Sequence, residues 1–125
     1  MNPTFPILDD AGLKRLYDIG GDRLVNGLID LFVREAPVRV ANALNGSTCG
    51  DLDAVHRSAH SLKSTAANFG AVRLSELAGE IEQAAGLQDH ARVRQLLTGL
   101  EDAYDQTREA LVERRPAELR VPAAA

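Results

Sequence analysis

The sequence predicts an all-α fold: an up-and-down antiparallel four-helix bundle with a short N-terminal capping helix. Apolar residues recur at steps of three and four along most of the 125 residues, and this is the spacing of amphipathic helices. Runs with the period-two alternation of strands are missing. Breaks marked by glycine or proline divide the chain into one short helical segment and four longer ones.

The first expected helix is short. Asp9 or Asp10 can cap it, and the pair Gly20 and Gly21 ends it. Its apolar residues are Leu13, Leu16 and Tyr17.

A second helix is expected from about Asp22 to the turn-rich stretch 45–51, NGSTCGD. Pro37 falls inside this span, where proline removes a backbone donor and crowds the preceding turn. The apolar stripe resumes after it without a turn signal, so we expect one kinked helix.

The third helix should run from about Asp51 to Asn68, with Gly70 as its left-handed stop. A fourth helix then starts near Ala71. The connection is so short that the two helices must form an antiparallel hairpin. Their inward stripes are Leu52, Val55, Ala59, Leu62, Ala66 and Phe69 in the third and Leu74, Leu77, Ile81 and Ala84 in the fourth.

The fifth helix is expected from about Asp89 to Arg114, and Pro116 ends it. The folded domain should therefore cover residues 1–115. Residues 116–125 contain two prolines and few large apolar side chains, so we expect a mobile tail.

Composition excludes several classes of protein. The net charge of −4 argues against a nucleic-acid partner. No apolar run approaches the ~20 residues that cross a bilayer, so direct membrane insertion is not expected. A lone Cys49 and the absence of a signal segment indicate a reducing, cytoplasmic setting, and we expect a monomer.

The outward face of the third helix carries the chemistry. With its apolar stripe turned inward, His60 is exposed in mid-helix and Lys63 lies one turn further on. An uncharged imidazole is a nucleophile, and a lysine suits an incoming phosphoryl group. Ser64 and Ala67 are short, so a second protein can reach the ring. The other residues on this face are Asp53, His56 and Arg57.

Two other interpretations apply to these residues. If only their spacing is considered, an exposed His and Lys most simply belong to a solvent-exposed helix face that has no function. His56 and His60 have the i, i+4 spacing of a zinc pair, but no third ligand is placed by the sequence and Arg57 and Lys63 would repel a cation, so no metal site is expected. The chain also lacks a phosphate-binding loop, GxxxxGK[ST]. Any phosphoryl group must come from another protein.

The stretch AHSLKSTAANFGA, residues 59–71, resembles the signature of histidine-containing phosphotransfer (HPt) domains, A-H-x-L-K-[GS]-x-[SA]-x-x-[LF]-G-A. The flanking segments LIDLFVREAPVRV and LSELAGEIEQAA are similar to the neighbouring helices of that family. The resemblance spans about Ile7 to Leu111. Ser64 stands where many members have glycine.

The resemblance implies a phosphocarrier rather than a kinase. His60 would accept a phosphoryl group from the aspartyl phosphate of a response-regulator receiver domain or a hybrid sensor histidine kinase, and pass it to another receiver. Lys63 would stabilise the phosphoryl group. The receiver would bring the Mg²⁺ ion, so no cofactor is expected in this chain. A non-catalytic adaptor that binds a receiver without transfer is the alternative.

The receiver-facing surface is expected around His60. His56, Arg57 and Lys63 form a basic face that complements an acidic receiver pocket, with Ser64 and Ala67 beside them. The family implies that Leu13, Leu16 and Tyr17 can add to docking, although burial as a lid on the bundle explains them equally well. From the fourth helix, Glu82 or Gln83 can approach His60, and the sequence does not decide between them.

Overall fold

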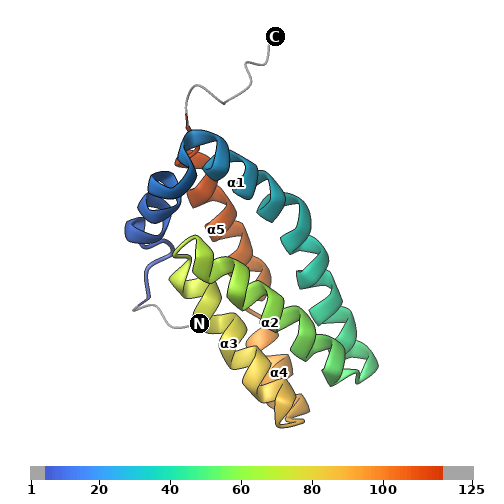
Figure 1. Cartoon of the computed structure of the whole chain (residues 1–125). Coiled ribbons are helices and arrows are strands. Elements are labelled where there is room, and N and C mark those ends of the chain that lie inside the picture. The colour runs from blue at the N-terminus through green and yellow to red at the C-terminus, as the bar shows by residue number, and fades with distance from the viewer. Residues whose placement is uncertain (1–4, 117–125) are drawn as a thin grey trace.

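The computed structural model describes residues 5–116, and all regular structure within them is helical, as predicted. The elements are α1 (Asp10–Cys49), α2 (Leu52–Asn68), α3 (Val72–Gly86), α4 (His90–Leu97) and α5 (Leu100–Glu113). They pack as an antiparallel bundle (Figure 1). The predicted C-terminal tail lies almost wholly outside the described residues.

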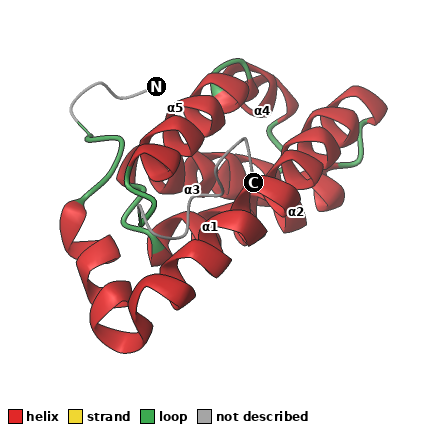
Figure 2. Ribbon diagram, turned by 90° about the horizontal axis from the view of Figure 1, so that it is seen from above, coloured by secondary structure: helices red, strands yellow, loops and turns green. Residues whose placement is uncertain are grey.

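A single residue divides α1 into two arms. Gly21 has φ 68° and ψ −163°, a conformation that only glycine adopts without strain. The break predicted at Gly20 and Gly21 is therefore confirmed. The short arm, residues 10–20, turns away from the long arm, residues 22–49, at one end of the bundle (Figures 1 and 2).

The short arm is fixed on the turn between α2 and α3. The backbone N–H of Asp9 donates to the Gly70 carbonyl at 2.7 Å, and a Cβ on Gly12 would lie only 2.6 Å from the Gly70 nitrogen. At the other end of the arm, the Tyr17 hydroxyl donates to the Arg114 carbonyl at 3.1 Å. The predicted capping helix is thus bonded to the turn between α2 and α3 and to the C-terminal end of α5.

The long arm continues through Pro37 as one helix, as predicted, but its backbone stays helical at the proline, and the break in α1 lies at Gly21 instead. Ala36 and Val40 are buried on either side of the proline, while Pro37 itself is exposed. The apolar stripe therefore passes the proline without a change of face.

The predicted fifth helix is wrong as a single element, because Thr98 and Gly99 separate α4 from α5. The Thr98 hydroxyl donates to the Gln95 carbonyl at 2.7 Å, and the Gly99 N–H bonds to the Leu96 carbonyl three residues back. This tighter turn stops the α-helical ladder for two residues. Together, α4 and α5 form the fourth side of the bundle.

The core joins the long arm to α2, α3 and α5. Phe32 packs edge-on against Phe69 and tilted against Tyr104, with both centroid distances at 5.5 Å. Because α2 packs between α1 and α3, its remaining face is left to solvent. Within the described residues, no helix has the length and apolar character needed to cross a membrane.

Candidate functional site

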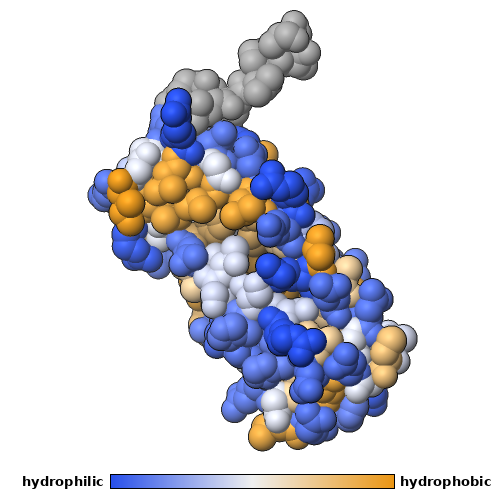
Figure 3. Space-filling view, turned by 45° about the vertical axis from the view of Figure 1, so that its right-hand side comes forward, coloured by the Kyte–Doolittle hydropathy of each residue, from blue (hydrophilic) through white to orange (hydrophobic). Residues whose placement is uncertain are grey.

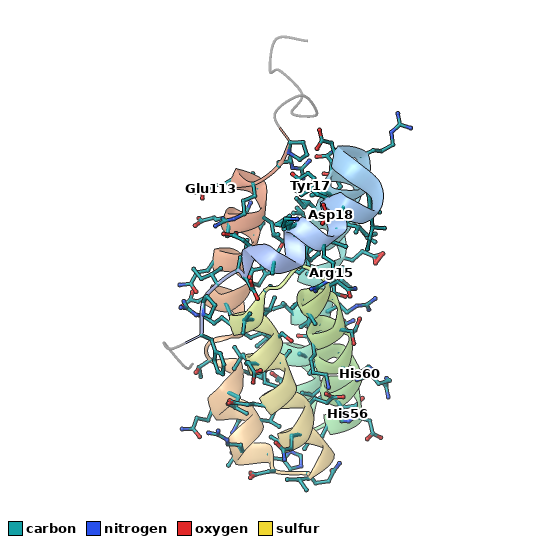
Figure 4. All side chains as sticks on the ribbon, turned by 60° about the vertical axis from the view of Figure 1, so that its left-hand side comes forward. Arg15, Tyr17, Asp18, His56, His60 and Glu113 are labelled. Atoms are coloured by element: carbon teal, nitrogen blue, oxygen red, sulfur yellow. The ribbon has the colours of Figure 1, made fainter. Side chains whose placement is uncertain are left out.

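The exposed ridge of α2 carries the predicted site. Asp51 caps the helix by accepting from the Ala54 N–H at 3.1 Å. The stripe Val55, Ala59, Leu62 and Ala66 is buried at 1% exposure or less. This packing turns His60 outward, with 61% of its side chain exposed. Figure 4 shows His56 and His60 projecting from the same side of α2.

Glu82 of α3 is the partner that the sequence left undecided. Its Oε2 lies 2.6 Å from His60 Nδ1, and its Oε1 lies 2.5 Å from Lys63 Nζ. Only 15% of the Glu82 side chain is exposed, whereas its neighbour Gln83 is exposed to solvent. One carboxylate thus holds both residues that the motif singled out.

The negative charge on Glu82 determines which nitrogen of the His60 imidazole carries the proton. The pKa of this carboxyl lies below its ordinary value of 4.5, first because Lys63 donates a hydrogen bond to it and then because His60 does, against the opposing effect of partial burial. At neutral pH the ionised carboxylate can only accept hydrogen bonds. His60 Nδ1 must therefore carry a proton, and Nε2 is the nitrogen with an available lone pair when the ring is uncharged.

The Lys63 side chain crosses from α2 to α3 over small residues of α3. A Cβ on Gly79 would lie 3.4 Å from Lys63 Cδ, in contact with the lysine stem. The Ser75 hydroxyl donates to the Lys63 carbonyl at 3.3 Å. The lysine is 40% exposed, so its ammonium group reaches Glu82 and still faces solvent.

His56 stands apart from this group. Its Nε2 lies 3.9 Å from Glu82 Oε2, beyond hydrogen-bond distance, and 45% of the side chain is exposed. Among the described residues, no three His, Cys, Asp or Glu side chains are grouped as metal ligands.

Some of the other predicted surface residues are exposed and others are buried. Arg57, Ser64 and Ala67 are exposed on the same ridge as His60. Leu13, in contrast, is only 4% exposed, because the short arm packs it into the core. A docking role for Leu13 is therefore wrong. Leu16 is partly buried and lines an apolar hollow of 260 Å³ between the two arms of α1 and α2.

Sequence periodicity did not identify every residue near the site. Glu82 flanks the buried position Ile81, which marks it as a boundary residue of α3, but the side of the boundary that faces His60 depends on how α2 and α3 cross. Arg39, which lies across the α1–α2 seam from Arg57, was missed. Its position opposite Arg57 depends on how α1 and α2 cross, which the sequence pattern does not give.

Comparisons with known proteins agree with this geometry. The family model described as Hpt domain matches residues 27–110. The chain is similar to the crystal structure of histidine-containing phosphotransfer protein B (HptB) from Pseudomonas aeruginosa PAO1. The TM-score is 0.82 at 29% sequence identity, and the match covers 88% of this chain and 95% of that chain. A comparison with curated proteins finds no match. His60, Lys63 and Glu82 all lie within the residues matched by the family model.

Proposed function

Since the chain belongs to the Hpt domain family, we propose that His60 carries a phosphoryl group from one receiver aspartate to another in a two-component phosphorelay. The observation that supports this most is the hydrogen bond between His60 Nδ1 and the Glu82 carboxylate at 2.6 Å. It leaves Nε2 as the attacking atom.

The proposed step exchanges one bond for another. The Nε2 lone pair attacks the phosphorus of an aspartyl phosphate, the N–P bond forms, and the P–O bond to the aspartate breaks, leaving a carboxylate. Nδ1 keeps its proton, so the ring becomes positively charged. The Glu82 carboxylate faces this charge as it develops and stabilises it, as a buried acid does for a catalytic imidazole. Transfer to the next receiver reverses the step.

Whereas Glu82 acts on the imidazole ring, Lys63 acts on the phosphoryl group. An ammonium group has three donors, and the bond to Glu82 at 2.5 Å uses one of them. A second can meet a phosphoryl oxygen on His60. Lys63 thus stabilises the phosphoryl group while it balances the charge of Glu82.

The proposed partners are proteins that supply the groups this reaction needs in addition to His60 and Lys63. We propose that receiver domains, free or in a hybrid sensor histidine kinase, supply the acceptor aspartate and the Mg²⁺ ion, and that this chain uses no cofactor of its own. The receiver meets the ridge formed by His56, Arg57, Ser64 and Ala67, with Leu16 at its edge. A monomeric domain of residues 1–115 in the cytoplasm fits this role, without nucleic acid as a partner.

The alternative is an adaptor that binds a receiver without accepting phosphate. The hydrogen-bonded pair of His60 and Glu82 favours the carrier, because binding alone does not require a fixed imidazole tautomer. The experiment that separates the two mixes the protein with phosphorylated receiver domains and follows the label. We expect acid-labile phosphate on the wild type and none on His60→Gln. Binding without labelling of the wild type would support the adaptor.

A further inference from the structure

A second hollow lies on the other flank of α2, between α2 and the long arm of α1. It has a volume of 560 Å³ and is open to solvent. Two cations, Arg39 of α1 and Arg57 of α2, line it, together with the side-chain amides of Asn42 and Asn45 and the hydroxyl of Ser58. Groups that can donate hydrogen bonds therefore dominate its wall.

The two arginines have no partner inside the described part of the chain. Neither guanidinium group makes a hydrogen bond or an ion pair there. The one carboxylate that lines the hollow, on Asp51, is engaged as the cap of α2 with the Ala54 N–H. By comparison, Arg115 pairs with Asp30 at 2.6 Å on another part of the surface.

One residue of the hollow's wall also lines the apolar hollow, and another lies close to His60 along α2. Arg57 precedes His60 by one helical turn on the exposed ridge. Arg39 lines both hollows, and Leu31, 41% exposed, lies two turns before it in the apolar one. Figure 3 shows hydrophobic surface gathered at one end of the bundle and mostly hydrophilic surface along the rest of this face.

We infer that Arg39 and Arg57 bind carboxylates of the receiver domain that docks on His60. This inference rests on the proposed function and extends it to a second contact. The chain carries a net charge of −4, which would repel an acidic partner. The guanidinium groups of Arg39 and Arg57 form a locally positive site to which such a partner can bind. Guanidinium groups bind carboxylates through paired hydrogen bonds, and such contacts at the rim of an interface speed association and select the partner.

The test measures binding rather than transfer. A panel of receiver domains is titrated by calorimetry at low salt, and the one that binds the wild type most tightly is kept. The double variant Arg39→Gln with Arg57→Gln is compared with Arg92→Gln plus Arg94→Gln, which removes the same charge from α4. Circular dichroism checks that both variants fold.

For the α1–α2 variant we expect Kd to rise about tenfold, as the loss of two exposed ion pairs implies. The slope of log Kd against log salt should also become shallower. The α4 variant should match the wild type. Equal effects of the two variants, no effect of either, or no receiver bound by the wild type would overturn the inference. Receiver binding without transfer would refute the proposed function and leave this test valid.

Discussion

On the α3 side of α2, His60 and Lys63 share the Glu82 carboxylate at 2.6 and 2.5 Å. On the α1 side, Arg39 and Arg57 line an open hollow and have no partner among residues 5–116. The charged side chains of α2 are thus paired on the flank that meets α3, whereas Arg57 on the flank that meets α1 is unpaired within the described residues. Pairing fixes geometry, which a reacting imidazole needs. Cations without a partner in the chain can bind an anionic group of another molecule.

Removal of Glu82 should have the largest effect, because it breaks the paired flank. In Glu82→Ala, His60 loses the group that holds its proton on Nδ1 and stabilises the charged ring, so we expect transfer to slow by about a hundredfold or more. Single-turnover transfer from a saturating phosphorylated receiver measures this. The control is Gln83→Ala on the exposed face of α3, which should match the wild type. Equal rates for all three proteins would contradict the role of Glu82.

Lys63→Gln should have the next largest effect. Because Lys63 is 40% exposed, water can partly replace its donor, and we expect transfer to slow by about tenfold, less than for an enclosed donor. At saturating receiver, Arg57→Gln should leave the same rate unchanged. If both variants slow the step equally, the two flanks do not differ in the way proposed.

The stability contributed by Glu82 should depend on pH. Its pKa is lowered in the folded protein, so its contribution is complete above the ordinary value of 4.5 and is lost as the pH falls through the lowered value. The melting temperature of the wild type should exceed that of Glu82→Gln at neutral pH. The gap should narrow below pH 4.5. A gap that is constant with pH would show that the charge of Glu82 does not contribute to folding.

His56→Ala should have the smallest effect. His56 Nε2 is 3.9 Å from Glu82 Oε2, too far for a hydrogen bond. At saturating receiver the transfer rate should therefore change by less than about twofold, the effect expected from an exposed charge pair. Zinc titration of the same pair of proteins should show no tight binding to either. Tight binding that depends on His56 would restore the metal interpretation.

Periodicity and turn residues predicted the parts of the fold that depend on local sequence. Gly21 and Gly70 both adopt positive φ where the breaks were expected. The buried stripe of α2 placed His60 and Lys63 outside, as the steps of three and four indicated. The break at Gly99 was missed because the apolar stripe continues from α4 into α5.

Contacts between helices could not be predicted in the same way. Three features depend on how the helices cross: the choice between Glu82 and Gln83, the burial of Leu13, and the position of Arg39 and Arg57 on one hollow. A small rotation of one helix exchanges such neighbours. The motif therefore predicted His60 and Lys63 as site residues, and the packing of the helices showed that Glu82 contacts both.

Nuclear magnetic resonance of the protein with ¹⁵N-labelled histidine tests most directly whether Glu82 selects the reacting nitrogen of His60. At mildly alkaline pH we expect the proton on Nδ1 and the lone pair on Nε2, and after transfer from a phosphorylated receiver we expect phosphorus bonded to Nε2. In Glu82→Ala the preference for the Nδ1 proton should be lost. A wild-type ring protonated on Nε2, or phosphate bonded to Nδ1, would contradict the proposal.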